Sequence, residues 1–213
     1  MGATLNVLGP HTAAKTSRRG VPRGWGGLAA VLAGGVALAP GPAHAQDVPP
    51  QMQAVLVVKA VAYDQSLKTR AQGAVNVVVL FRPGHAASES GSTAVTNALT
   101  GLAKKADVAG LPLRVVAMPY TTAAALDAAV QAQKATVVFV GPGLADAVGA
   151  ISGVTRKRSV LTACGSEEYV RAGLSMGIVL KNDKPSILVN LAATRAEGAS
   201  LDANLLRIAQ VIM

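Results

Sequence analysis

Hydrophobic positions in this chain fall into short β-branched runs separated by stretches with helical spacing. The clearest runs are 74–81, 113–118, 136–140 and 159–163. Continuous apolar runs of this length are typical of strands that are covered on both faces. Between them, apolar residues recur three and four positions apart, as on one face of a helix. This alternation predicts an α/β domain with a mostly parallel sheet, flanking helices and right-handed crossovers.

A helix is predicted before the first strand, starting near Pro49 and Pro50, because proline lacks only a donor that the first turn leaves unpaired. Its polar side is expected to include Gln53, Lys68 and Arg70. The stripe expected to face the core consists of Met52, Val55, Leu56, Lys59, Ala62, Tyr63 and Leu67. Further helices are expected over about 92–105, after a cap at Thr121 or Thr122, and through Leu144, Val148 and Ile151.

The C-terminal stretch predicts a hairpin followed by a closing helix. The runs 175–180 and 186–191 flank a turn over 182–185, in which Pro185 is expected to stop the pairing. Ser200 or Asp202 can cap the helix. Its apolar face is expected to hold Leu201, Leu205, Ile208, Ala209 and Ile212. The hairpin would extend the edge of the parallel sheet.

Residues 1–45 have the pattern of a secretory signal peptide. Basic residues without any acidic one precede the apolar run 28–39, and Ala43-His44-Ala45 offers small residues for cleavage. The basic residues are Lys15, Arg18, Arg19 and Arg23. Cleavage is expected between Ala45 and Gln46, which leaves one α/β domain over 46–213 in the periplasm.

The alternative, an uncleaved membrane anchor, is disfavoured because the apolar run is shorter than the roughly 20 residues that span a bilayer. Ser17-Arg18-Arg19 leaves twin-arginine export open beside general secretion.

Removal of the leader lowers the net charge. The remaining chain has 16 basic and 11 acidic residues, a net charge of +5. Arg156-Lys157-Arg158 is its one dense basic cluster, and a solvated loop explains that cluster better than nucleic acid binding does. Nucleic acid is therefore not expected as a partner.

Gly141-Pro142-Gly143 stands between a predicted strand and a predicted helix, where dinucleotide-binding loops occur. Asp146 occupies the place of the third glycine, and Pro142 removes a backbone donor that a pyrophosphate would need. A structural turn is favoured, and no cofactor is expected. The G-x-x-x-x-G-K motif of nucleotide hydrolases is absent from the sequence.

Cys164 and Gly165 follow the fourth predicted strand, and the carboxyl ends of strands are where open α/β sheets place ligands. Gly141, Cys164 and Gly165 are therefore the candidates for a ligand crevice. A catalytic thiol usually needs a nearby base, and the only histidine after the leader, His85, stands on another predicted loop. Cys164 is interpreted as a buried thiol, and whether it pairs between two chains stays open. One histidine and one cysteine do not indicate a metal cluster.

Other polar residues near the C-terminus have structural interpretations. Glu167 and Glu168 are expected as a charge pair at a helix start. Arg195 and Glu197 are expected on the solvated surface. Asn190 lies within an apolar run and is expected to make a structural hydrogen bond to a neighbouring loop.

A family resemblance is carried by the order and spacing of several short pieces. They are Val160-Leu161-Thr162, Gly173 before a short strand, 187–191 ending in Asn-Leu, Arg195, and Leu205-Leu206 with Ala209. This succession resembles the YfiR/HmsC family. The resemblance implies a small periplasmic regulatory domain without enzymatic activity. Such a domain would restrain a membrane-bound diguanylate cyclase or sensor kinase by binding its extracytoplasmic sensor part, and could act as a dimer.

The sequence also departs from the family pattern. Some members carry paired cysteines that form a redox switch, which Cys164 alone cannot reproduce within one chain. Tyr63-Asp64 stands where many relatives have Trp-Pro. The alternative function is a small-molecule binding protein, or a weak enzyme, that uses the crevice near Gly141, Cys164 and Gly165.

Overall fold

The computed structural model describes residues 48–213, so the predicted leader and its cleavage site at Ala45 and Gln46 lie outside the described residues. The helices are α1 (Pro50–Ala62), α2 (Leu67–Ala71), α3 (Ala86–Ala103), α4 (Ala123–Ala132), η1 (Ala145–Ala147), α5 (Val148–Arg158), α6 (Glu167–Arg171), α7 (Leu191–Ala196) and α8 (Ala203–Ile208). The strands are β1 (Val75–Phe81), β2 (Leu113–Pro119), β3 (Val137–Val140), β4 (Leu161–Cys164), β5 (Met176–Lys181), β6 (Lys184–Asn190) and β7 (Gln210–Ile212).

All seven strands join one sheet in the order β2-β1-β3-β4-β5-β6-β7. The first five positions in this order run parallel, β6 is antiparallel to β5, and β7 is parallel to β6. This arrangement confirms the predicted fold class. The four apolar runs of the sequence form β1, β2, β3 and β4, each within two residues of its predicted bounds.

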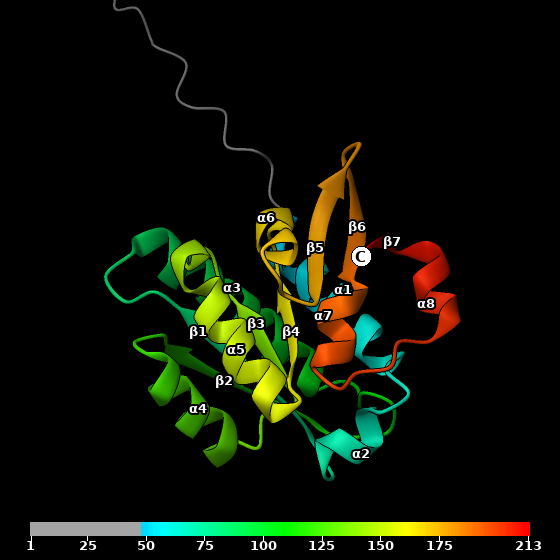
Figure 1. Ribbon diagram of the computed structural model, residues 1–213, viewed down its shortest axis with the longest axis horizontal. Coiled ribbons are helices and arrows are strands. Elements are labelled where there is room, and N and C mark those ends of the chain that lie inside the picture. The colour runs from blue at the N-terminus through cyan, green and yellow to red at the C-terminus, as the bar shows by residue number, and fades with distance from the viewer. Residues whose placement is uncertain (1–47) are drawn as a thin grey trace, which may run out of the picture. The chain divides into compact units, whose positions relative to one another are not determined.

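Helices cover both faces of the sheet (Figure 1). On one face, α1 and α3 bury a core that includes Val57, Leu99 and Phe139. On the other face, α4, α5 and α6 pack over a second core that includes Leu126 and Ile151. Because both faces are dry, the central strands β3 and β4 are buried at every position, as their continuous apolar sequence predicts.

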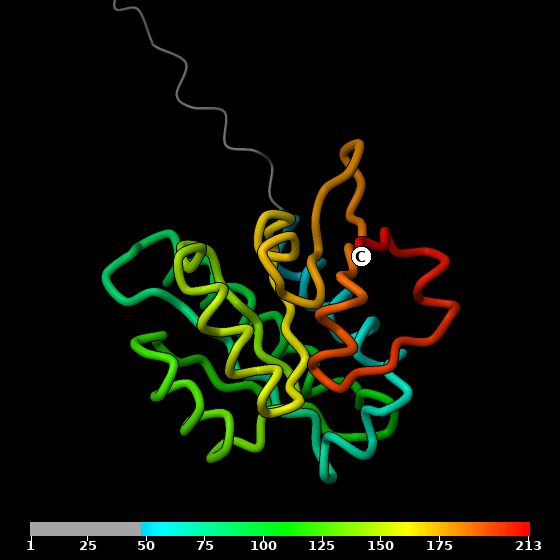
Figure 2. The backbone as a smooth tube through the Cα atoms, in the orientation of Figure 1, coloured from blue at the N-terminus to red at the C-terminus, as the bar shows by residue number. Residues whose placement is uncertain are grey.

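The hairpin of β5 and β6 is confirmed, but its turn is shorter than predicted. Asn182 and Asp183 both adopt positive φ angles, 49° and 59°, which two-residue hairpin turns require and which Asn and Asp tolerate. Pro185 lies inside β6 opposite Leu180, so it does not stop the pairing. Figure 2 shows this turn reaching beyond the neighbouring strands.

The closing helix is shorter than the sequence predicts. Asp202 does cap a helix, α8, because its Oδ1 accepts a hydrogen bond of 2.7 Å from the backbone N–H of Asn204. The helix ends at Ile208, whose side chain is 73% exposed. Ile212 belongs instead to β7, which pairs with β6 through Asn190 and covers the outer edge of the hairpin.

The buried face of α1 also differs from the prediction. The helix begins after Pro49 as expected but ends at Ala62, and its buried residues are Gln53, Ala54, Val57, Ala60 and Val61. Met52 and Tyr63, expected in the core, are each 43% exposed. The small side chains of Ala54 and Ala60 are fully buried against the sheet and α3, so this face rather than the bulkier stripe makes the closest packing.

Two other boundaries differ from the prediction. Helix α3 begins at Ala86, well before residue 92, because His85 caps it through Nδ1, which accepts from the N–H of Ser88 at 3.2 Å. The basic cluster at 156–158 is the last turn of α5 and not a loop. Cations are favourable at a helix C-terminus, and Arg158 also binds both carboxylate oxygens of Asp127.

Glu197 is the largest departure from expectation, because this residue is completely buried. Its Oε1 accepts from the hydroxyls of Thr155 (2.7 Å) and Thr162 (3.0 Å). Its Oε2 accepts from the N–H of Thr162 (2.7 Å) and from the hydroxyl of Ser175. These bonds join the end of α7 to α5, β4 and the start of β5. Burial raises the pKa of Glu197 above its ordinary value, although the four donors act in the opposite direction.

Asp64 closes the opposite side of the C-terminal segment. Its carboxylate pairs with Arg70 and accepts hydrogen bonds from the backbone N–H groups of Ser66 and Ser200. Burial by itself raises the pKa of Asp64, but the bonds from Arg70, Ser66 and Ser200 outweigh it and hold the pKa below its ordinary value. The residues after α1 are thereby attached to the residues before α8.

Asn190 has the structural role that the sequence predicts. Its Oδ1 caps α7 by accepting from the N–H of Ala193 at 3.0 Å. Its Nδ2 donates to the carbonyl of Val170 in α6 at 3.1 Å. A single amide therefore joins the end of β6 to two helices.

The buried network predicts a large loss of stability for one substitution of Glu197 and a small one for another. Glu197→Ala leaves the N–H of Thr162 without its acceptor and should lower the free energy of unfolding by about 2–4 kcal/mol. Glu197→Gln should retain most of the stability, because an amide nitrogen in place of Oε1 can donate to both threonine hydroxyls. Denaturant titrations measured by circular dichroism check both values.

The same variants test the ionisation of Glu197. Because its pKa is raised in the folded state, its contribution to stability is complete below the ordinary value of 4.5 and is lost as pH rises through the folded-state pKa. The stability of Glu197→Gln should not show this loss. Parallel pH dependence of the two proteins would contradict the assignment.

Candidate functional site

A cavity of about 490 Å³ lies at the carboxyl ends of β3 and β4. Its described lining comes from the start of α1, the first turns of α3, the ends of these strands and the start of α6. The lining residues are Val48, Pro49, Pro50, Gln53, Ala87, Ser90, Gly91, Val95, Phe139, Val140, Pro142, Ala145, Gly165, Ser166, Glu168 and Tyr169. The volume lies within the range of about 300–1,000 Å³ that small-molecule sites occupy.

Gly141, one of the three sequence candidates, is buried beside the cavity without lining it. A Cβ atom here would lie 2.1 Å from the hydroxyl of Ser92 and 2.5 Å from the carbonyl oxygen of Leu80. Ser92 donates its hydroxyl to that carbonyl at 3.1 Å. Gly141 is therefore required for the close contact between α3 and the strand ends.

Cys164 is also outside the cavity lining, and its thiol is fully buried among the side chains that α5 and α6 cover. The thiol donates to the carbonyl oxygens of Ser166 (3.2 Å) and Met176 (3.4 Å). Burial raises the pKa of Cys164 to about 12. These contacts confirm a buried thiol and are unfavourable for a nucleophile.

Gly165 does line the cavity, and there it contacts a residue that the sequence reasoning missed. A Cβ atom on Gly165 would lie 3.0 Å from Oε1 of Gln53. Gln53 is only 9% exposed, and its Nε2 donates to the carbonyl of Val48 at 2.7 Å. Within residues 48–213, no group donates to Oε1. Helical periodicity placed Gln53 on the polar side of α1, and no signal in the sequence indicated its burial.

Tyr169 connects the loop after β3 to α6. Its hydroxyl oxygen accepts from the backbone N–H of Leu144 at 2.9 Å. Burial raises the pKa of Tyr169, so the hydroxyl stays protonated and keeps a hydrogen to donate. This bond fixes one wall of the cavity relative to α6.

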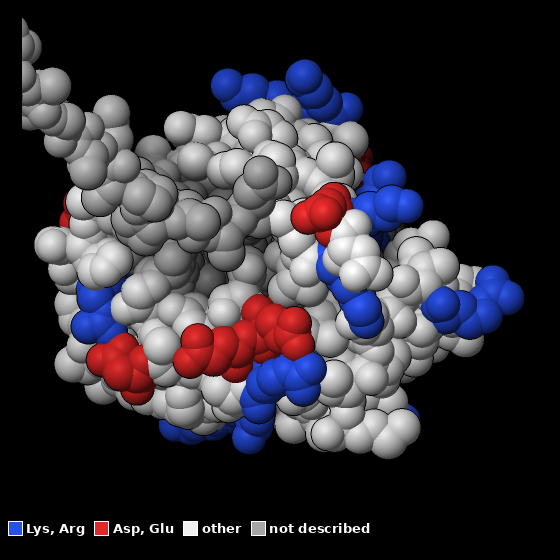
Figure 3. All heavy atoms as spheres, turned by 90° about the horizontal axis from the view of Figure 1, so that it is seen from above, with Lys and Arg blue, Asp and Glu red and all other residues white. Residues whose placement is uncertain are grey.

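Glu168 is the only charged residue in the described lining, and its side chain lies on an exposed part of α6. As the sequence predicts, Glu167 and Glu168 open a helix; Glu167 then pairs with Arg171 at 2.5 Å. Figure 3 views the molecule from the side of α6 and shows Asp and Glu atoms gathered on part of this face.

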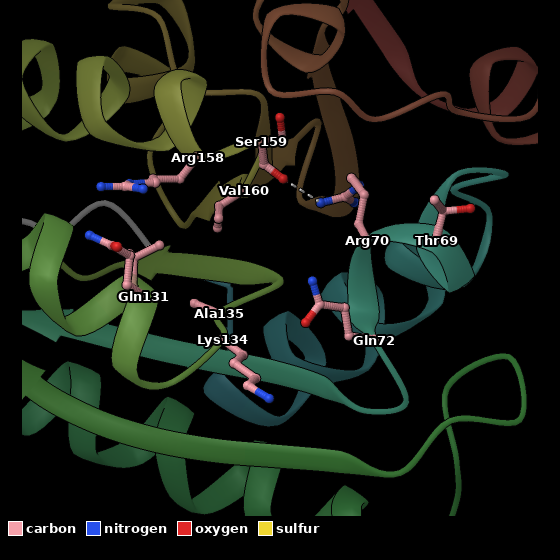
Figure 4. Close-up of a pocket in the computed structure, with 10 residues that line it drawn as sticks. Thr69, Arg70, Gln72, Gln131, Lys134, Ala135, Arg158, Ser159 and Val160 are labelled. Carbon is pink, nitrogen blue, oxygen red and sulfur yellow. Dashed lines mark hydrogen bonds between the residues drawn. The ribbon is translucent and has the colours of Figure 1, made fainter.

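A second cavity of about 490 Å³ lies near the amino ends of β3 and β4 (Figure 4). It is lined by Thr69, Arg70, Gln72, Val130, Gln131, Lys134, Ala135, Arg158, Ser159 and Val160. The helices α2, α4 and α5 all end here, so their negative dipole ends meet the three basic side chains.

Two of these cations already have partners. Arg70 pairs with Asp64 and donates to the carbonyl oxygens of Ser159 (3.1 Å) and Thr136 (3.3 Å), and Arg158 pairs with Asp127. Arg70 and Arg158 therefore lie where they stabilise the C-terminal ends of helices α2 and α5, and no ligand is needed to explain their positions. This cavity is therefore a weaker candidate for a ligand than the one at the carboxyl ends.

Residues 48–213 contain no group of three side chains arranged to hold a metal ion. Among the same residues, no helix combines the length and hydrophobicity needed to cross a membrane. Arg195 is exposed, as predicted.

The mostly parallel sheet with helices on both faces defines an α/β domain. A family model described as YfiR/HmsC-like matches residues 51–210, and the chain belongs to this family, whose members are periplasmic regulators. The family resemblance seen in the sequence is thereby confirmed. No curated protein matches the chain.

Several solved structures share the fold at low sequence identity. The ABC domain in complex with L-Trp from Streptococcus pneumonia has a TM-score of 0.54 and 13% identity, over 77% of this chain and 60% of that one. The ligand-free, open structure of CD0873, a substrate binding protein with adhesive properties from Clostridium difficile, has a TM-score of 0.51 and 16% identity, over 70% and 57%. A conserved domain protein from Vibrio cholerae has a TM-score of 0.55 and 16% identity, over 78% and 61%.

The chain thus spans about three fifths of the length of the structures it matches. At these identities the likeness shows the fold alone.

The burial of Cys164 predicts a thiol that does not react in the folded protein. With a pKa of about 12, roughly one molecule in ten thousand would carry a thiolate at pH 8. Ellman's reagent should leave the folded protein unmodified for hours and should titrate one thiol per chain after unfolding in guanidinium. Non-reducing electrophoresis of the folded, alkylated protein should show no disulfide-linked dimer. Rapid modification of the folded protein would contradict this structure of the site.

Proposed function

We propose that this protein is an exported, non-enzymatic regulator that restrains a membrane-bound signalling protein. The leader would direct export and be cleaved between Ala45 and Gln46. The restrained protein would be a diguanylate cyclase or sensor kinase, bound through its extracytoplasmic sensor domain. The observation that carries the proposal is the YfiR/HmsC-like match over residues 51–210, which covers nearly all of the described domain.

The chemistry at the strand ends supports a binding role over a catalytic one. Cys164 is held protonated, and Nδ1 of His85 is occupied as a helix cap. Neither arrangement supplies an activated nucleophile with its base.

Exposed apolar side chains near the C-terminus support binding to another protein. Ile208 is 73% exposed, Val211 38% and Met213 fully exposed. All three follow the start of α8, next to the short edge strand β7. Apolar side chains exposed close together mark a candidate contact surface, for a sensor domain or for a second copy in a dimer.

The regulatory role predicts a rise in cyclic di-GMP when the gene is deleted. Intracellular cyclic di-GMP, measured by mass spectrometry, should return to its original level when the full chain is supplied from a plasmid. A matched chain that lacks residues 2–45 should accumulate without restoring that level, because it cannot reach a periplasmic sensor domain. Unchanged cyclic di-GMP in the deletion strain would rule out restraint of a cyclase, and restoration by the leaderless chain would contradict the need for export.

A second candidate function is small-molecule binding through the crevice at the carboxyl ends of the strands. The cavity beside Gly165 is the observation that favours it. It also lies where open α/β sheets bind ligands.

Small-molecule binding predicts that at least one metabolite stabilises the folded protein. A panel of periplasmic metabolites screened by thermal shift should contain a compound that raises the melting temperature in proportion to the logarithm of its concentration. A panel without any such compound would count against this second function.

A further inference from the structure

We infer that the cavity at the carboxyl ends of β3 and β4 binds a small molecule that is neutral or positively charged, with an apolar body and a hydrogen-bond donor. This inference rests on the second candidate function, small-molecule binding, and specifies its ligand class. It does not depend on the identity of the regulated membrane protein.

The apolar part of the ligand follows from the inner walls. Val95, Phe139 and Val140 are each at most 3% exposed and form the inner side of the cavity. Pro49, Pro50 and Pro142 add rigid apolar surface nearer the opening. Transfer of an apolar body from water to such walls is favourable because it removes apolar surface from contact with water.

The charge of the ligand follows from the ionisable groups in the lining. Among the described lining residues none is Lys or Arg, and the carboxylate of Glu168 is the only formal charge. Helix α1 begins at Pro50 after Pro49, so the prolines remove N–H groups that a helix N-terminus otherwise offers to an anion. Helix α3 also begins beside the cavity, where His85 accepts from the N–H of Ser88 and Glu89 adds a negative charge to the first turn. A carboxylate or phosphate group would therefore find repulsion from Glu168 and no cation to pair with.

The hydrogen-bond donor follows from the amide of Gln53. The buried side chain is held by its bond from Nε2 to Val48, which leaves Oε1 next to Gly165 as an acceptor without a donor in the described part of the chain. Oε1 is not among the solvent-excluded unpaired atoms of the described residues, but a ligand that fills the cavity would cover it, so a ligand N–H or O–H that reaches it is favoured over an apolar group. The hydroxyl of Ser166 caps no described helix N–H, and it adds a second polar group nearby.

The cavity at the amino ends of the same strands does not offer this chemistry. Two of its three cations, Arg70 and Arg158, are held by Asp64 and Asp127 and stabilise helix ends, and Lys134 adds a third positive charge. An anion preference in solution would point to that second cavity, so charge selectivity distinguishes the two sites.

The inference is tested with four probes that share a phenyl body: phenethylamine, phenethyl alcohol, ethylbenzene and hydrocinnamate. The full-length gene is expressed and the protein is purified as the cell processes it, and affinities are measured by ligand-observed NMR titration. Phenethylamine and phenethyl alcohol should each bind about tenfold or more tightly than hydrocinnamate, a difference of about 1.4 kcal/mol. Tightest binding of hydrocinnamate, or no measurable binding of any probe, would overturn the inference.

Matched variants locate the binding. Ser90 and Thr93 are both exposed on α3, but only Ser90 lines the cavity. Ser90→Trp should weaken phenethylamine binding about tenfold or more by filling the opening, whereas Thr93→Trp should leave it within about twofold. Equal affinities for the two variants would place the probe elsewhere and overturn the inference.

Ethylbenzene, which has no hydrogen-bond donor, distinguishes the loss of the Gln53 hydrogen bond from a general change in the shape of the cavity. Gln53→Leu should weaken phenethyl alcohol binding several-fold and leave ethylbenzene binding unchanged or improved. Equal loss of both probes would show a general change in the cavity and would overturn the hydrogen-bond assignment. If the metabolite that stabilises the protein is an anion, the inferred ligand class would be overturned. The small-molecule function itself would stand.

Discussion

The structure depends on one constraint: both faces of the parallel part of the sheet must be buried beneath helices. Val137–Val140 and Leu161–Cys164 are buried at every position, so the apolar side chains of the two central strands need apolar neighbours from the covering helices. A polar group inside such a sheet must be hydrogen-bonded, as Thr162 of β4 is to Glu197, and open space for a ligand is left to the strand ends. The two large cavities accordingly lie at the two ends of β3 and β4, and not on either face.

The C-terminal segment meets the same constraint with buried carboxylates. Glu197 satisfies the N–H of Thr162 and three hydroxyl groups without any cation, whereas Asp64 is paired with Arg70. The pKa of Glu197 is accordingly raised by burial, and that of Asp64 is lowered by its donors despite burial. Glu197 attaches the end of α7 to β4 and to the start of β5, and Asp64 attaches the residues before α8 to the residues after α1.

The sequence predicted the sheet well, because a strand covered on both faces leaves a continuous apolar run that needs no tertiary information. It predicted less where burial depends on small or polar residues. Alanine is common both on the surface and in the interior of helices, so Ala54 and Ala60 do not reveal the buried face of α1, and periodicity assigns Gln53 on that face to solvent. Glu197 was assigned to the surface because a buried carboxylate is rare, and its four donors come from segments far apart in the sequence. Of the crevice candidates, only Gly165 lines the cavity, since neither the direction of the Cys164 side chain nor the close contact at Gly141 can be read from spacing.

The two ends of the sheet differ because helix direction sorts their charges. Strands β1 to β5 run parallel, so the helices that lead directly into them, α2, α4 and α5 among them, terminate at the amino ends. Arg70, Lys134 and Arg158 therefore stand where negative dipole ends accumulate. At the carboxyl ends the helices begin, and the usual consequence is an anion site. Here Pro49 and Pro50 withhold donors at the start of α1, and α6 opens with Glu167 and Glu168. Acidic residues at a helix start stabilise the helix itself, and in doing so they compensate the positive dipole end that an anionic ligand would otherwise use. The prolines and glutamates at these helix starts therefore disfavour an anion, which is one basis of the neutral or cationic ligand class that we propose for this cavity.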